Sequence, residues 1–352
     1  MSAASRAGAA APVIETTAVT KFFTLGRDTV GRSRPPLKAV DGVSLAIRRG
    51  ETLALVGETG SGKTTFGRLL LSLYRPTSGD ILYRGDSILD KRGTAAKAVR
   101  RQVQGVFQDP YSSLNPTMTV GQSLAEVLSV HHVVPRAGRA ERVAELLSTV
   151  GLSPAQAARR PHAFSGGERQ RVGIARALAV EPEVVIADEP LSALDVSIQA
   201  QVLNLMIRLQ DERGLTYLFV THDLDVARHI SQRTAVLYLG RVVEEAPTTE
   251  IFAEPLHPYT QALVAAAPRL TTQRKTIKPA LTGDIPSAID RPSGCHFHPR
   301  CPFVMPVCRE TEPALLRLGG GRSVACHLHD PGLAAATPAA AAPAAEDAAP
   351  AD

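Results

Sequence analysis

The chain has 352 residues, of which 44% are hydrophobic, and its mean hydropathy is −0.01, as in ordinary folded globular proteins. It contains no apolar run of about eighteen residues, which excludes a bilayer-spanning helix. No apolar run follows the first arginine, so we expect no secretory signal and a cytoplasmic location. The formal net charge is +5, and residues 1–40 supply +4 of it, so the folded body lacks the basic stripe typical of nucleic-acid binding.

Residues 1–12 are rich in alanine, and we expect them to form a disordered arm. From residue 13 onward, apolar runs of strand length alternate with helical patterns, which indicates an α/β fold around a mostly parallel sheet. The predicted strands cover residues 53–56, 184–187, 217–221 and 235–239. One predicted helix places five apolar side chains on a single face, namely Ile198, Val202, Leu205, Met206 and Leu209.

Near residue 250 the composition changes, because proline and cysteine become frequent and strand patterns fade. We therefore expect one domain over residues 13–250 and a small cysteine-rich domain over residues 251–332. Residues 333–352 are mostly alanine and proline and offer nothing from which a core could be built, so we expect a disordered tail.

A glycine-rich motif of the pattern G-x-x-x-x-G-K-[ST] follows the first of these strands. Such glycines let backbone N–H groups converge on phosphate oxygens, and the next helix adds its positive end. A plain turn before a helix is the alternative, but it would not require Lys-Thr at the end of the motif. The predicted nucleotide-binding residues are Gly57, Glu58, Thr59, Gly60, Ser61, Gly62, Lys63, Thr64 and Thr65.

Polar residues follow two further predicted strands. Asp188 and Glu189 end one strand, and His222 ends the next along the chain. Because ligands bind at the carboxyl ends of parallel strands, we expect these side chains to lie beside the glycine-rich loop. Asp188 and Thr64 would then hold Mg²⁺, and Glu189 would polarise an attacking water. Capping of the following segment, and a purely structural histidine, are the alternatives.

Residues 164–171, Phe-Ser-Gly-Gly-Glu-Arg-Gln-Arg, resemble the signature motif of the ATP-binding cassettes, which is usually spelled L-S-G-G-Q. Ser165, Gly166, Gly167 and Glu168 would form a second anion site at a helix N-terminus. The resemblance implies that this site closes over the ATP of another subunit. Glu168 replaces the usual glutamine and adds a negative charge near that triphosphate.

Other segments are similar to the same family. Gln108 matches its glutamine loop, which senses the γ-phosphate, joins the Mg²⁺ shell and contacts the membrane subunit. Phe23 falls where the family stacks an aromatic ring on adenine, although Phe22 is adjacent. The resemblance implies catalytic roles for Glu189, His222 and Gln108. A loop that couples the two nucleotide sites is matched by Ser192, Ala193, Leu194 and Asp195.

Residues 110–116 and 257–263, together with the cysteine-rich end, resemble the oligopeptide/dipeptide importers, and nickel importers share much of this pattern. The resemblance implies ATP and Mg²⁺ as ligands and two membrane permease subunits as partners. It also implies a second ATPase, similar or identical, an indirect extracytoplasmic binding protein, and a position at the cytoplasmic membrane face. A soluble cassette ATPase would need two cassettes or a long coiled-coil insertion. A redox protein that merely binds nucleotide would not need Glu189.

The family fold is a P-loop NTPase core with a small antiparallel β subdomain near its start and an α-helical subdomain over about residues 110–175. To this we add a small cysteine-rich C-terminal appendage. Its four cysteines, clustered in a reducing compartment, favour a metal site over disulfides. A [4Fe–4S] cluster, which some relatives carry, is favoured over zinc, and free thiols are the third alternative. We expect this site to be structural, and its residues are Cys295, Cys301, Cys308 and Cys326.

Overall fold

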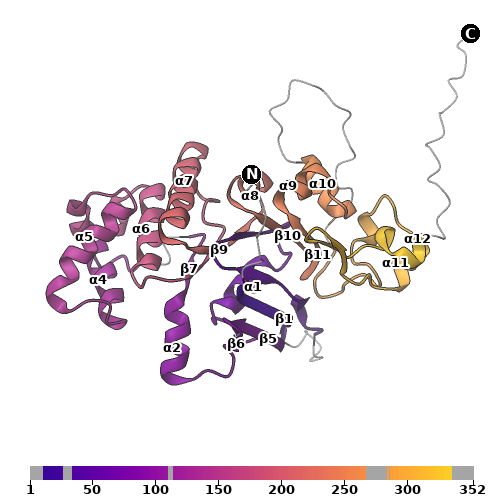
Figure 1. Cartoon of the computed structure of the whole chain (residues 1–352), viewed down its shortest axis with the longest axis horizontal. Helices are drawn as coiled ribbons and strands as arrows, with labels where there is room; N and C mark the ends of the chain where they lie inside the picture. Colours follow the sequence, from indigo (N-terminus) through magenta and orange to yellow (C-terminus); the bar gives the residue numbers. More distant parts are fainter. Residues whose placement is uncertain (1–10, 27–33, 110–113, 267–283, 285, 335–352) are drawn as a thin grey trace, which may run out of the picture.

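The computed structural model describes residues 11–26, 34–109, 114–266, 284 and 286–334. These residues form an eight-stranded sheet, a five-stranded sheet and several helices. Figure 1 shows a helical group at one end of the molecule and the C-terminal segment, which is the described part of residues 251–334, at the opposite end. The larger sheet lies between them. None of the helices in these ranges is long and apolar enough to cross a membrane.

The larger sheet has the strand order β12-β13-β11-β10-β4-β9-β8-β7, and its strands from β10 to β7 are parallel. Every residue of β4, β8 and β9 is buried, which explains why these strands read as unbroken apolar runs. All four predicted strands are confirmed to within two residues. The parallel strands are β4 (Thr52–Val56), β7 (Val103–Val106), β8 (Val184–Asp188), β9 (Thr216–Thr221) and β10 (Arg233–Tyr238).

The smaller sheet is antiparallel, as predicted for the start of the domain. It contains β1 (Pro12–Phe23), β2 (Leu37–Val43), β3 (Ala46–Arg48), β5 (Ser78–Tyr83) and β6 (Asp86–Ser87). Its apolar residues share one buried cluster with β4 and with helix α1 (Lys63–Leu70). The smaller sheet therefore packs directly on the strand and helix that flank the glycine-rich loop.

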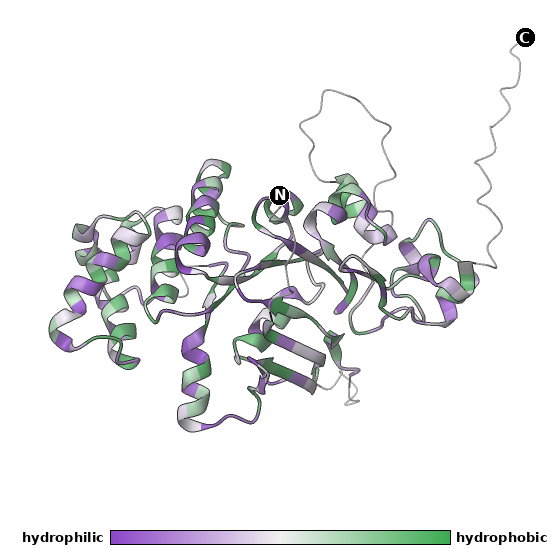
Figure 2. Cartoon of the chain, viewed as in Figure 1, coloured by the Kyte–Doolittle hydropathy of each residue, from purple (hydrophilic) through white to green (hydrophobic). Residues whose placement is uncertain are grey.

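The helical subdomain is also confirmed over the residues described. Helices α4 (Val120–Val130), α5 (Arg139–Thr149) and α6 (Gly166–Leu178) share one core with α7 (Val196–Arg213). Helices α4 and α5 carry both hydrophobic and hydrophilic residues, as expected of helices that bury one face and expose the other (Figure 2). Short helical turns at Arg136–Gly138, Pro154–Ala158 and Pro161–Ala163 join them, and α2 (Gly93–Gln102) and α8 (Leu224–Ile230) complete the cassette.

The C-terminal segment is part of the larger sheet, so the predicted separate appendage is not confirmed. Strand β13 (Arg322–Val324) pairs with β11 (Arg241–Pro247), and β12 (Leu316–Gly319) pairs with β13. Strands this short leave no periodic signal in the sequence. The boundary predicted near residue 250 falls inside α9 (Thr248–Ala253), and the segment also contains α10 (Pro258–Ala266), α11 (Pro306–Glu310) and α12 (Pro331–Ala334).

The predicted arm and tail lie almost entirely outside the residues described. Pro12 already belongs to β1, and Leu333 belongs to α12. Residues 110–113 of the importer-like motif also lie outside them.

The C-terminal segment and the cassette share a buried cluster. Phe297 and Tyr259 pack there with Tyr238 of β10 and with Ala54 and Val56 of β4. The ring centroids of Phe297 and Tyr238 lie 5.4 Å apart at right angles, and those of Tyr259 and Tyr238 lie 4.7 Å apart. The two parts therefore share one buried core.

We expect Phe297→Ala to lower the free energy of unfolding by about 3–5 kcal/mol, because it leaves a cavity in this shared core. Phe303→Ala is the matched control, since Phe297 is 1% exposed and Phe303 is 51% exposed. Urea unfolding of both variants checks the expectation. A similar small effect of both substitutions would show that the segment does not stabilise the cassette.

Candidate functional site

A cavity of about 760 Å³ opens at the carboxyl ends of β4, β8 and β9. It brings together residues from five separate sequence motifs, and its size suits a ligand as large as a nucleotide. Residues of the C-terminal segment also line it, which sequence reasoning did not anticipate. The lining residues are Leu37, Ala39, Thr59, Gly60, Gly62, Lys63, Thr64, Thr65, Gln108, Glu189, Ser192, His222, Leu239, Pro286 and Ala288.

Two glycines of the loop are required by close backbone approach. A Cβ at Gly57 would collide with the carbonyl oxygen of Leu237, and one at Gly62 would collide with that of Ala39. Both glycines have positive φ angles, +153° and +103°. Helix α1 begins at Lys63, so its first N–H groups lie at the cavity, where they can bind an anion.

Lys63 supplies the positive charge at this loop. Its buried Nζ donates hydrogen bonds to the carbonyl oxygens of Gly57 and Glu58 at 2.7 and 2.9 Å. Burial lowers the pKa of Lys63, and the carboxylates of Glu189 and Asp188 oppose that effect. The ammonium group therefore stands among acceptors in a partly desolvated cavity, where its attraction for an anionic ligand is stronger than in water.

Thr64 lines the cavity, and Asp188 is hydrogen-bonded to it from the end of β8. The Thr64 hydroxyl donates to Asp188 Oδ1 at 2.9 Å. Burial raises the pKa of Asp188, while the hydrogen bond from Thr64 opposes the rise. A hydroxyl and a carboxylate side by side are the hard oxygen ligands that Mg²⁺ takes in phosphate sites. The residues therefore fit the predicted cation, and Gln108 lines the same cavity.

Glu189 and His222 form the second polar pair. His222 Nδ1 lies 3.3 Å from Glu189 Oε2. Glu189 has a φ of +46°, a left-handed conformation that costs a non-glycine residue energy. Its N–H donates to the carbonyl oxygen of Val220, and its carbonyl oxygen accepts from Ser192 Oγ. These bonds hold the strained backbone in place, so that the carboxylate lines the cavity.

The predicted signature residues lie at the start of α6. Ser165 caps the helix, its Oγ accepting from the N–H of Glu168, and the Glu168 carboxylate accepts from the N–H of Ser165 at 2.8 Å. This bond lowers the pKa of Glu168, and Gln156 Nε2 donates to the same carboxylate. The negative charge that replaces the usual glutamine is therefore engaged within its own subunit.

The start of α6 packs closely against the predicted coupling loop, residues 192–195, and against α7. A Cβ on Gly167 would collide with Ile198 of α7, and a Cβ on Gly166 would crowd Leu194. Asp195 precedes the first residue of α7, and Ala193 lies between Ser192 and Leu194. Within the described ranges, residues 165–168 contribute nothing to the lining of the cavity, whereas Ser192 does.

The predicted adenine-contacting aromatic does not line the cavity. The ring of Phe23 packs edge-on against Tyr74, with centroids 5.4 Å apart, and Lys21 Nζ lies 5.1 Å from the Phe23 ring. Phe22 lies beside Lys38. The role of Phe23 stays a prediction.

Sequence reasoning missed two residues that contact the glycine-rich loop from the C-terminal segment. Arg300 forms a bidentate ion pair with Glu58, and the Tyr259 hydroxyl accepts from the Glu58 N–H. Tyr259 belongs to the importer-like motif at 257–263, which was the only signal for it. Arg300 directly precedes Cys301, so the cysteine segment is close to the loop in space although it is distant in sequence.

The four predicted cysteines gather in the C-terminal segment. Burial raises the pKa of Cys326 to about 12, and the thiols of Cys295, Cys301 and Cys308 add to the rise. The backbone N–H of Cys295 donates to the carbonyl oxygen of Cys308 at 2.8 Å, and Cys295 and Cys301 pack against the same buried cluster. Across the described part of the chain, no group of three His, Cys, Asp or Glu side chains is placed to hold a single metal ion.

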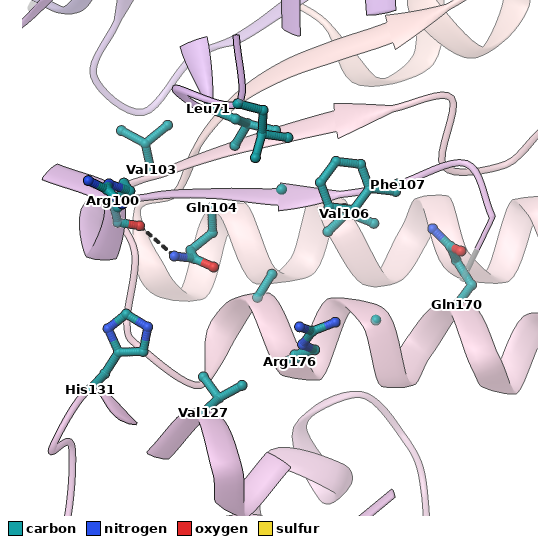
Figure 3. A pocket seen from close by; sticks show the side chains of 14 residues that line it. Leu71, Arg100, Val103, Gln104, Val106, Phe107, Val127, His131, Gln170 and Arg176 are labelled. Carbon is teal, nitrogen blue, oxygen red and sulfur yellow. Dashed lines mark hydrogen bonds between the residues drawn. The ribbon is translucent and has the colours of Figure 1, made fainter. Parts of the chain in front are cut away.

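A groove of about 260 Å³ lies between β7, α4 and α6. Figure 3 shows Val103, Val106 and Phe107 on one side of it, and Val127 and Arg176 on the other. Gln108, the residue after Phe107, lines the cavity at the glycine-rich loop. Consecutive residues thus face the groove and the cavity. Leu73, which is 57% exposed, also lines the groove.

Comparisons with known proteins agree with this arrangement. Residues 40–192 match the family model of the ABC transporter, and residues 243–308 match the C-terminal region of the oligopeptide/dipeptide transporter. The oligopeptide transport ATP-binding protein AppF of Bacillus subtilis is 48% identical over 90% of this chain and 97% of its own length. The dipeptide transport ATP-binding protein DppF of Escherichia coli is 48% identical over 84% of this chain and 88% of its own.

Two solved structures share the cassette fold. CbiO1 of Clostridium perfringens, part of the transporter complex CbiONQ, superposes with a TM-score of 0.59 at 28% identity, over 69% of this chain and 92% of its own. The dimeric cassette MJ0796 in a post-hydrolysis state with ADP and Pi also gives 0.59, at 30% identity, over 67% of this chain and 98% of its own. With the cavity, the loop and the matched C-terminal region, these relatives show that the chain is an ABC ATPase and belongs to the ATP-binding subunits of the oligopeptide/dipeptide transporter family.

Proposed function

We propose that this subunit hydrolyses ATP to drive the import of dipeptides or oligopeptides through a membrane transporter. The observation that carries the proposal is the gathering of Lys63, Thr64 and Glu189 in the lining of one cavity, with Asp188 hydrogen-bonded to Thr64. The relatives named for peptide transport support the substrate class. A nickel or other small-solute importer is the second candidate, since the cavity itself contains nothing that distinguishes the cargo.

In this proposal the loop and Lys63 bind the β- and γ-phosphates of ATP. Thr64 and Asp188 would hold Mg²⁺, with Gln108 beside them, and the bound cation would offset the charge of the phosphates. Binding here is mostly positioning and charge compensation, which is the main contribution of such enzymes to phosphoryl transfer.

Glu189 is the proposed general base. It would orient a water whose oxygen attacks the γ-phosphorus, and it would accept the proton that this water loses. The bond from the γ-phosphorus to the bridging oxygen breaks, so ADP and phosphate leave. His222, at 3.3 Å, would hold the carboxylate in place.

We also propose that two ATPase subunits face each other. Ser165 and its neighbours, which lie outside the cavity lining of their own chain, would complete the cavity of a second subunit. The exposed apolar side chain of Val196, directly after the 192–195 loop, supports an interface at this place. The second subunit would be a copy of this chain or a similar ATPase.

We expect Glu189→Gln to slow ATP hydrolysis by about 10²-fold or more while ATP binding is nearly unchanged, because only proton acceptance is lost. Phosphate release measured over a range of ATP concentrations checks this. Glu141→Gln, an exposed carboxylate on α5, is the matched control and should hydrolyse ATP at the native rate.

The same variant tests the facing arrangement. Since Glu189→Gln holds ATP without turnover, saturating Mg-ATP should shift it from monomer to dimer in light scattering, alone or mixed with the partner ATPase. Native hydrolysis by Glu189→Gln would remove the general-base assignment. Monomers under all of these conditions would contradict the shared site.

The groove between β7, α4 and α6 is the proposed docking place for a cytoplasmic helix of a membrane permease. Apolar residues line it, Arg100 and Arg176 provide positive charge along it, and its residue Phe107 is joined directly to Gln108 of the cavity. An amphipathic helix with acidic residues would fit this chemistry. Attachment here would place the subunit at the cytoplasmic face of the membrane.

We expect Leu73→Glu to abolish co-purification with the two permease subunits while the isolated subunit still hydrolyses ATP. The new carboxylate would replace an apolar contact and repel the acidic residues of the docking helix, so the helix would not seat. Leu318→Glu is the matched control, since Leu318 is 44% exposed at the C-terminal edge of the sheet. Permease binding that survives Leu73→Glu would show that the helix docks elsewhere.

We propose finally that the four cysteines hold a [4Fe–4S] cluster. The backbone hydrogen bond from Cys295 to Cys308 and the packing of Cys295 and Cys301 against one buried cluster support a site. A [4Fe–4S] cluster keeps its thiolates farther apart than one zinc ion does. Cys308 and Cys326 are buried, and Cys295 and Cys301 are half-buried, so solvent access to the site is limited.

Protein purified without oxygen should then be brown and contain about four irons per chain. Cys301→Ser and Cys308→Ser should each remove the colour and most of the iron, measured by absorbance and metal analysis. Finding one zinc ion per chain would show that the cysteines form a zinc site. Finding no metal would show that they are four free thiols.

A further inference from the structure

Glu58, the second residue of the phosphate loop, carries a side chain that contacts the C-terminal segment. Arg300 Nη1 and Nη2 donate to its two carboxylate oxygens at 2.7 and 3.0 Å. The Arg300 side chain is 4% exposed and that of Glu58 is 22% exposed. A bidentate pair of this kind fixes direction as well as distance.

The backbone of Glu58 is held as well. Its N–H donates to the Tyr259 hydroxyl at 2.8 Å, and its carbonyl oxygen accepts from Lys63 Nζ at 2.9 Å. Glu58 therefore links the C-terminal segment on one side to the phosphate-binding lysine on the other. Its carboxylate also acts electrostatically on Lys63, and pairing with Arg300 neutralises that charge.

Arg300 itself is fixed by its surroundings. The backbone N–H of Arg300 donates to the carbonyl oxygen of Phe297 at 3.0 Å, within the turn that runs from Cys295 to Cys301. Its guanidinium lies 5.9 Å from the Phe297 ring and 6.0 Å from the Tyr238 ring. Both rings are fully buried, so the guanidinium has a rigid support.

We propose that Arg300 is a positioning residue for nucleotide binding: it neutralises and orients Glu58, so that Lys63 and the loop are free to bind phosphate. The inference deepens the proposed function and rests on ATP binding at residues 57–64. Through Arg300, ATP affinity would depend on the segment that holds the four cysteines, residues 295–326. Distance along the sequence had suggested that this segment is separate from the nucleotide site.

We expect Arg300→Gln to weaken ATP binding about tenfold, the size of effect that one unpaired charge near a phosphate site produces. The freed Glu58 carboxylate would compete for Lys63 and repel the triphosphate. The kcat at saturating ATP should change less than KM, because Arg300 contacts neither the Thr64–Asp188 pair nor Glu189. Binding is measured with a fluorescent ATP analogue displaced by Mg-ATP.

A second substitution separates positioning from structural damage. Adding Glu58→Gln to Arg300→Gln removes the unpaired charge, so it should restore most of the affinity. Arg322→Gln is the matched control, because Arg322 forms ion pairs with Glu250 and Glu254 in the same segment and should leave KM unchanged. Melting temperatures of all variants report any loss of folding.

Unchanged affinity in Arg300→Gln, or a loss that Glu58→Gln does not restore, would overturn the inference. If Arg300→Gln does not fold, Arg300→Lys takes its place, with a loss of about threefold expected because an ammonium group cannot make both bonds at once; unchanged binding there would also overturn it. Lys63→Ala distinguishes the two proposals: if it binds ATP as tightly as the native protein, the proposed nucleotide site is wrong.

Discussion

The parallel pairing of β4 with β9 and of β9 with β8 is the constraint on which the site depends. Val56 is registered with Thr221, and Asp188 with Val220, so the three strands end at one level. The residues that follow these strands are Gly57, Glu189 and His222, which therefore meet at one edge of the sheet. A slip of one residue in the register would turn the side chains of Glu189 and His222 to the opposite face of the sheet.

Close backbone packing adds a second condition at that edge. Gly57 and Gly62 pass so near to the carbonyl oxygens of Leu237 and Ala39 that no side chain fits there. The loop is thus held in shape by neighbours from β10 and β2, and its N–H groups are arranged before any ligand arrives. Such preorganisation saves the free energy that ordering the loop would otherwise cost during binding.

The C-terminal segment extends the cassette in both structure and chemistry. It continues the sheet through β13, buries Phe297 and Tyr259 against β4 and β10, and reaches the loop through Arg300. The signature residues show the opposite relation. They lie away from the cavity lining of their own chain, and this is the observation behind our proposal that they complete the cavity of a second subunit.

The sequence by itself determined the cassette, because its strands are buried on both faces and its phosphate loop needs particular residues at particular positions. It also predicted several residues of the cavity lining. Lys63, Glu189 and His222 were predicted because they come after apolar strands, whereas Gln108 and Ser192 were predicted only from the family resemblance. The lining residues Pro286 and Ala288 were not predicted. Only the tertiary structure decided that Glu168 is engaged in a helix cap, that Phe23 packs on Tyr74, and that the C-terminal segment joins the sheet. The bidentate pair of Arg300 with Glu58 joins residues 242 positions apart. No local pattern records such a contact, because it arises from the packing of strands and rings that lie far apart in the chain.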